Sequence, residues 1–133
     1  YVANVGDSRL YVVNGDICQV SRDHSLVEEL VAKGELERGS QDYYEQKNII
    51  TRAVGIKGKV RADFFEVELQ RGDVILLCSD GLTNMVSDER IARIIETSAS
   101  LSTMAHVLVD EANKNGGKDN ISVVLIKPEI ETR

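Results

Sequence analysis

The stretch Val74-Ile75-Leu76-Leu77-Cys78-Ser79-Asp80-Gly81 places a carboxylate directly after an apolar run. The five apolar residues predict a strand that is buried on both faces. Ser79-Asp80-Gly81 predicts a turn at the end of this strand, because glycine lets the backbone bend tightly. The buried strand would then hold Asp80 in a fixed position, as a metal ligand requires. Taken alone, the pattern favours an ordinary turn aspartate, since aspartate is common in turns.

The composition is that of one globular domain. The chain has 133 residues, of which 42% are hydrophobic and 29% are charged, and this length suits a single core. Its net charge of -6 argues against nucleic acid or an anionic membrane as a partner. An anionic substrate is compatible with this charge, because bound cations supply positive charge locally.

The two cysteines, Cys18 and Cys78, lie in apolar runs and are expected to be buried free thiols rather than a disulfide or a zinc site. With no stretch long enough to span a membrane, we expect a cytoplasmic location. The chain starts at Tyr1 without methionine, inside an apolar segment. We therefore expect a fold that is incomplete at its N-terminus.

Local signals predict strands first and helices later. Asn14-Gly15 is a strong hairpin signal between apolar runs, and Ser25 with Glu28 forms a capping box that starts a helix. Residues 35–47 are polar and are expected to form an irregular loop. The remaining expected elements are strands over 1–5, 10–13, 17–20, 62–69, 74–78 and 121–126 and helices that begin at Ser87 and near Ser100 or Ser102. Strands separated in this way from helices indicate an α+β fold.

Three aspartates share one setting at the end of a strand. Asp7 follows Gly6, Asp80 precedes Gly81, and Asp119 stands two residues after Gly117, just before a strand. If these strands belong to one core, the three carboxylates can converge on one site. Oxygen ligands on rigid mounts suit Mg²⁺ or Mn²⁺. Two such ions would polarise a phosphoryl oxygen and activate a water, although aspartate beside glycine is also common in turns.

An ordered series of motifs resembles the bacterial PP2C-family metal-dependent serine/threonine protein phosphatases. The resemblance covers essentially the whole chain and implies two packed antiparallel sheets flanked by helices. It also implies hydrolysis of phosphoserine and phosphothreonine in proteins, with Mn²⁺ or Mg²⁺. The motifs are Gly6-Asp7-Ser8-Arg9, Arg22-Asp23-His24-Ser25, Ile50-Thr51-Arg52-Ala53-Val54-Gly55, Leu77-Cys78-Ser79-Asp80-Gly81-Leu82 and Gly117-Lys118-Asp119-Asn120-Ile121-Ser122.

Carried over residue by residue, the resemblance makes Asp80 and Asp119 ligands of the second metal of a catalytic pair. Asp7 is implied to hold a third metal together with Asp80. Asn120 and Gly81 are implied to orient these ligands. The segment 25–53 resembles the flap of the family, which is linked to substrate choice.

The chain departs from the family pattern in one large respect. It has no aspartate-glycine-x-glycine-glycine-histidine motif, which in the family supplies the carboxylate that bridges both metals and the general acid. The resemblance therefore places the acid upstream of this chain. We expect the chain alone to be nearly inactive, and to self-associate because its sheets would keep open edges and bare faces.

Three functions compete at this point. The leading one is a protein phosphatase acting on phosphorylated proteins, with a cognate serine/threonine kinase as a further partner. The second is a non-catalytic PP2C-like regulatory or binding module, and the third is a phosphatase-like domain attached to a sensor. Asp7, Asp80 and Asp119 favour catalysis, because a binding module has no need of them.

Overall fold

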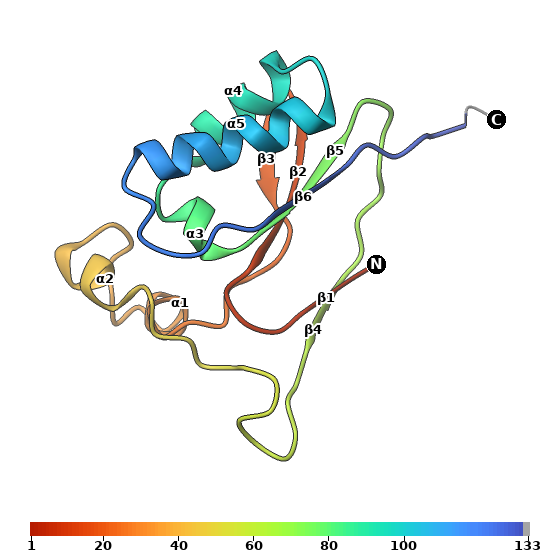
Figure 1. Cartoon of the computed structure of the whole chain (residues 1–133). Helices are drawn as coiled ribbons and strands as arrows, with labels where there is room; N and C mark the ends of the chain where they lie inside the picture. Colours follow the sequence, from red (N-terminus) through yellow and green to blue (C-terminus); the bar gives the residue numbers. More distant parts are fainter. Residues whose placement is uncertain (132–133) are drawn as a thin grey trace.

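The computed structural model describes residues 1–131. Figure 1 shows two long helices, α4 and α5, lying on a sheet, with a separate strand pair and two short helices beside it. The strands are β1 Val2–Asn4, β2 Arg9–Asn14, β3 Asp16–Gln19, β4 Asp63–Phe65, β5 Val74–Cys78 and β6 Val123–Ile126, and the helices are α1 Leu26–Ala32, α2 Gln41–Gln46, α3 Asp80–Thr83, α4 Asp88–Thr97 and α5 Leu101–Lys114.

The strands form two antiparallel sheets. One has four strands in the order β3-β2-β5-β6, and the other pairs β1 with β4. In the larger sheet, Leu10 lies opposite Leu77, which lies opposite Val124. The predicted α+β class with antiparallel sheets and helices is confirmed.

One face of the four-stranded sheet carries the core. Side chains alternate between the two faces of a strand, so Tyr11 and Val13 point to the same side as Leu76 of the neighbouring strand. All three are at most 1% exposed. The helices α4 and α5 cover this face with apolar stripes. The buried residues on those stripes are Ile91, Ala92, Ile94, Ile95, Met104, Leu108 and Ala112.

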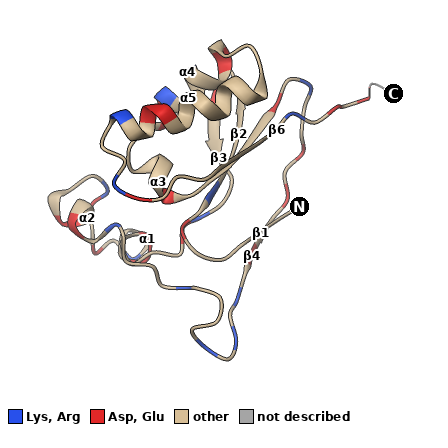
Figure 2. Cartoon of the chain, in the orientation of Figure 1, with Lys and Arg blue, Asp and Glu red and all other residues tan. Residues whose placement is uncertain are grey.

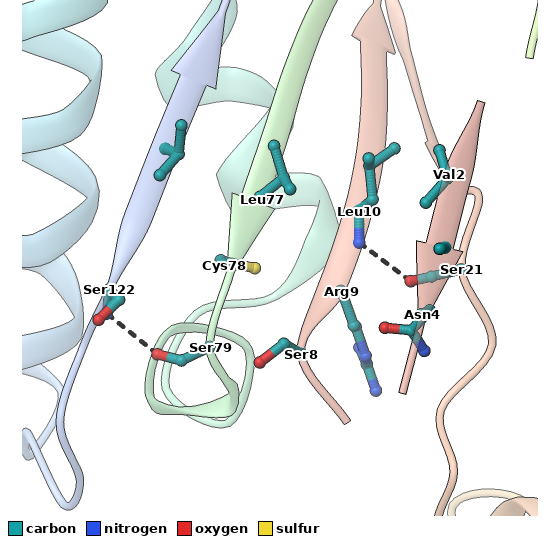
Figure 3. Close-up of a pocket in the computed structure, with 12 residues that line it drawn as sticks. Val2, Asn4, Ser8, Arg9, Leu10, Ser21, Leu77, Cys78, Ser79 and Ser122 are labelled. Carbon is teal, nitrogen blue, oxygen red and sulfur yellow. Dashed lines mark hydrogen bonds between the residues drawn. The ribbon is translucent and has the colours of Figure 1, made fainter. Parts of the chain in front are cut away.

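The opposite face of the same sheet is apolar and bare. Leu77, Val124 and Ile126 are 37%, 56% and 45% exposed, and the strands β5 and β6 carry no charged residue (Figure 2). A hollow of about 340 Å³ opens here, with Val2, Leu10 and Leu77 in its wall (Figure 3). The prediction that β5 is buried on both faces is therefore wrong, because the helices cover one side only.

Serine caps start the helices as local sequence predicts. The hydroxyl of Ser25 accepts a hydrogen bond from the Glu28 N–H, and that of Ser87 accepts one from the Arg90 N–H. Ser100, rather than Ser102, caps α5 through the Thr103 N–H.

Four local predictions need correction. Cys18, which was expected to be buried, is exposed on the edge strand β3. The loop expected over 35–47 contains α2, which begins after the cap Ser40. The strand expected over 62–69 pairs only over Asp63–Phe65. Asp80, which was expected to lie in a turn, is the first residue of the short helix α3. Along residues 1–131, none of the helices has the length and apolar character needed to cross a membrane.

Candidate metal centre

The end of β5 is fixed to the start of β6 by three hydrogen bonds. The Ser79 N–H donates to the Ser122 carbonyl at 3.0 Å, and the Ser122 N–H donates to Ser79 Oγ at 3.0 Å (Figure 3). Ser79 Oγ in turn donates to the Asn120 carbonyl at 3.2 Å. Asp80 follows Ser79 and Asp119 precedes Asn120, and both neighbours take part in these hydrogen bonds. The backbones at Asp80 and Asp119 are therefore held at a fixed spacing.

Gly81 brings the two segments into direct contact. A Cβ atom at this position would overlap the Asn120 carbonyl oxygen and lie 2.9 Å from its carbonyl carbon. The absence of a side chain therefore allows the start of α3 to approach the backbone beside Asp119. Asp80, Gly81 and Asp119 line one open pocket of about 480 Å³.

Asp7 faces Asp80 from a different part of the chain. It follows Gly6, whose φ of 106° lies in a region that suits glycine. Burial is the largest cause that raises the pKa of Asp7, and the negative charges of Asp80 and Asp23 raise it further. Asp7 and Asp80 also line a second, narrow pocket of about 40 Å³. Asp80 thus lines one pocket with Asp7 and another with Asp119.

Asp23 is a site residue that sequence reasoning missed. It lines the narrow pocket with Asp7 and Asp80, and it accepts hydrogen bonds from Arg9 Nε at 3.0 and 3.1 Å and from Nη2 at 2.8 Å. Although burial opposes it, this pairing with Asp23 raises the pKa of Arg9. The motif Arg22-Asp23-His24-Ser25 was the available signal, but Asp23 lacks the neighbouring glycine that marked the other three.

Residues 43–48, within the segment predicted to be a flap, form the other wall of both pockets. Tyr43, Lys47 and Asn48 line the narrow pocket, and Tyr44 lines the wider one. The Asn84 side chain at the end of α3 donates to Asn48 Oδ1 at 3.1 Å. The pocket with Asp7, Asp23 and Asp80 and the pocket with Asp80 and Asp119 are therefore both bounded by residues of this segment.

This donor set fits a divalent cation. Burial raises the pKa of Asp7 most, and repulsion from the nearby carboxylate of Asp80 raises it further. A cation between the two carboxylates would remove that repulsion. Within the part of the chain that the structure describes, no three His, Cys, Asp or Glu side chains are grouped so that they could hold one ion. An ion held by two carboxylates would complete its shell with water, as Mg²⁺ commonly does.

Comparison with known proteins identifies the family. Residues 37–129 match the profile described as Stage II sporulation protein E (SpoIIE). The match covers more than half of the chain, and serine/threonine phosphatases of bacteria are among its relatives and structural neighbours. The chain therefore belongs to the SpoIIE/PP2C-type phosphatase family, as the motif series predicts.

Individual relatives and solved structures agree with this family assignment. The chain is 46% identical over 127 residues to serine/threonine phosphatase stp of Listeria innocua, covering 95% of this chain and 50% of that protein. It is 43% identical over 125 residues to protein phosphatase PhpP of Streptococcus pneumoniae, covering 93% and 51%. The structure of Stp1 from Staphylococcus aureus matches with a TM-score of 0.89 and 38% identity, over 96% of this chain and 50% of that one.

A further match is the catalytic domain of the phosphatase PstP in complex with two manganese ions, with a TM-score of 0.75 and 33% identity, over 92% of this chain and 50% of that one. The chain thus spans about half the length of the relatives that it matches.

Proposed function

We propose that the protein carrying this chain is a Mn²⁺- or Mg²⁺-dependent phosphatase that hydrolyses phosphoserine and phosphothreonine in proteins. The observation that carries the proposal is the position of Asp80, which faces Asp7 on one side and shares a pocket with Asp119 on the other. The names of the relatives support the reaction, and the two manganese ions of the PstP complex support the cofactor.

The ligands in this proposal are Asp80 and Asp119 for one ion of a catalytic pair, and Asp7 with Asp80 for a third ion. When bound, such ions supply Lewis-acid activation of a phosphoryl oxygen and of water. Asp80 acts as the fixed ligand, because β5 and the tie from Ser79 to Ser122 restrain its backbone.

Asp119 is oriented by its own neighbour. The Asn120 N–H donates to Asp119 Oδ1 at 2.7 Å, and the Asn120 backbone packs against Gly81. This arrangement supports the orienting roles assigned to Asn120 and Gly81. One carboxylate oxygen of Asp119 is engaged by this bond, which leaves the other for an ion.

We assign residues 25–53 to a flap subdomain within a partial phosphatase domain that spans 1–133. Its base is closed by a bridge between Ser25 and Ile50 and by a hydrogen bond from the Thr51 N–H to the His24 carbonyl at 2.9 Å. Because the flap lines both pockets beside Asp80, it is placed to contact the phosphorylated protein substrate.

The remaining parts of the proposal concern partners and location. Substrates are phosphorylated proteins, and a cognate serine/threonine kinase would supply them. The free thiols Cys18 and Cys78 support a reducing, cytoplasmic location. The bare face around Leu77 and Val124 supports self-association of the 133-residue chain when it is alone, and in that state we expect it to be nearly inactive.

The test is hydrolysis of a phosphothreonine peptide by the intact protein, with Mn²⁺ and with a chelator. Asp119→Asn should abolish turnover, because asparagine keeps the shape but removes the charge that holds a cation. Asp110→Asn, on the exposed side of α5, is the matched control and should retain activity. Chelator-resistant hydrolysis, or an unimpaired Asp119→Asn variant, would reject the metal mechanism, and inactivity of the wild type would favour a non-catalytic module.

A further inference from the structure

His24 joins the two segments that carry Asp7 and Asp23. Its imidazole Nδ1 accepts a hydrogen bond from the Gly6 N–H at 3.1 Å, and the backbone N–H of His24 donates to the Gly6 carbonyl at 2.9 Å. Gly6 immediately precedes Asp7, and His24 immediately follows Asp23. The two bonds therefore set the spacing between these two carboxylates, both of which line the narrow pocket with Asp80.

The other ring nitrogen links His24 to the strand pair and the flap. Because Nδ1 accepts a hydrogen bond, Nε2 carries the proton, and it donates to Asp63 Oδ2 at 2.7 Å. Asp63 Oδ1 accepts a second bond from Arg52 at 3.1 Å, and the Thr51 N–H donates to the His24 carbonyl. His24 thus connects the Gly6-Asp7 turn and β4 through its side chain, and the base of the flap through its backbone carbonyl.

Two simpler roles for His24 do not account for these contacts. Its side chain is only 5% exposed, and it is not among the residues that line the pocket with Asp7 and Asp80, so it is not placed to exchange a proton with a substrate. It is also no apolar packing residue, because both ring nitrogens are engaged in hydrogen bonds.

We propose that His24 is a positioning residue that fixes the spacing of Asp7 and Asp23 beside Asp80 in the narrow pocket. It also links this pocket to the base of the flap. The inference rests on the proposed function in one respect, namely that the pocket binds a divalent ion. It predicts that the bond to Gly6, rather than the bond to Asp63, determines the affinity of the pocket for Mn²⁺.

Two conservative substitutions separate the two bonds. In His24→Asn the side-chain oxygen lies near the position of Nδ1 and can accept the Gly6 N–H, but the side chain is too short to reach Asp63. In His24→Gln the amide nitrogen lies near the position of Nε2 and can donate to Asp63, but the side-chain acceptor for the Gly6 N–H is lost, while the backbone bond to the Gly6 carbonyl is kept. His24→Ala removes both side-chain bonds, to the Gly6 N–H and to Asp63. His106→Asn on the exposed side of α5 is the control substitution.

The experiment has two readouts on the intact protein. Hydrogen exchange of the Gly6 amide in metal-free protein reports the bond itself, with the amides of β5 as an internal reference for folding. Calorimetric titration with Mn²⁺ reports the pocket. We expect His24→Gln and His24→Ala to weaken Mn²⁺ binding by about 10–100-fold, as loss of an outer partner of a metal ligand does, and to accelerate Gly6 exchange. His24→Asn should resemble the wild type in both.

The outcomes distinguish this proposal from the function on which it rests. Equal Mn²⁺ affinities for His24→Asn and His24→Gln, or rapid Gly6 exchange in the folded wild type, would overturn the positioning role even if the protein is a metal-dependent phosphatase. An Asn-versus-Gln difference in a protein that binds Mn²⁺ but hydrolyses no phosphopeptide would support the positioning role and reject the proposed reaction.

Discussion

Gly81→Ala is the substitution for which the structure predicts the largest effect from the smallest chemical change. The new Cβ would overlap the Asn120 carbonyl oxygen, and it would lie 2.9 Å from the carbonyl carbon and 3.4 Å from Ile121 Cα. These atoms all belong to the backbone, so no side-chain rotation can make room. Since packed atoms need about 3.5–4 Å, either α3 or the segment beside Asp119 must move by about 1 Å.

The expected size of the effect follows from that displacement. Overpacking of this kind costs about 1–3 kcal/mol of unfolding free energy, which a folded domain survives in most cases. A shift of about 1 Å between groups that must act together costs on the order of 100-fold in rate. We therefore expect Gly81→Ala to fold but to lose about 100-fold in turnover, because Asp80 and Asp119 no longer keep their spacing.

The assay is hydrolysis of a phosphothreonine peptide by the intact protein at saturating Mn²⁺, with calorimetric Mn²⁺ affinity as the second readout. Gly58→Ala is the matched control, since a Cβ at that position meets nothing within 4 Å. Wild-type turnover and Mn²⁺ affinity in a folded Gly81→Ala variant would refute the claim that this contact sets the geometry of the site.

Three further predictions follow from the fold. The hydrogen bond from His24, followed by that from Arg52, lowers the pKa of Asp63 below 3.8. The stabilisation of the fold by ionised Asp63 should therefore be complete above pH 3.8 and fade as the pH falls through the lowered pKa. In chemical unfolding across pH, the loss of unfolding free energy in Asp63→Asn should shrink in acid, and a loss that stays constant would contradict this. Burial raises the pKa of Cys78 to about 12, so a thiol reagent at neutral pH should label exposed Cys18 rapidly and Cys78 only on unfolding; equal rates would argue against it. The isolated chain should associate through its bare sheet face, so light scattering should give a lower mass for Val124→Lys than for the control Val54→Lys; a monomeric wild type would rule the association out.

Local chemistry made much of the fold predictable. The hairpin at Asn14-Gly15 and the caps Ser25 and Ser87 depend on neighbouring residues alone, and the structure contains all three. The helix α2 was not predictable in this way, because few apolar residues mark it. Arg38, which lies between the two helices, instead pairs with Glu28 of α1 at 2.7 Å and stands over the Tyr43 ring of α2, 5.8 Å from its centroid.

The site was predictable only where sequence neighbours marked it. Glycine beside Asp7 and Asp80 indicated strand ends, and the structure brings these two together. Asp23 carries no such mark, and its role in the pocket depends on Arg9, which is 14 residues away. The bare face of β5 was also missed, since a run of apolar residues does not reveal how many layers cover it.

In the proposed metal centre, Asp80 is the carboxylate that the metal sites share. The most direct test of this role is calorimetric titration of the intact protein with Mn²⁺, comparing the wild type with Asp80→Asn and with the exposed control Asp110→Asn. We predict that the wild type and the control bind at least two ions, and that Asp80→Asn loses more affinity than the roughly 10–100-fold expected for an outer partner of a ligand. Wild-type Mn²⁺ binding by Asp80→Asn would contradict the account.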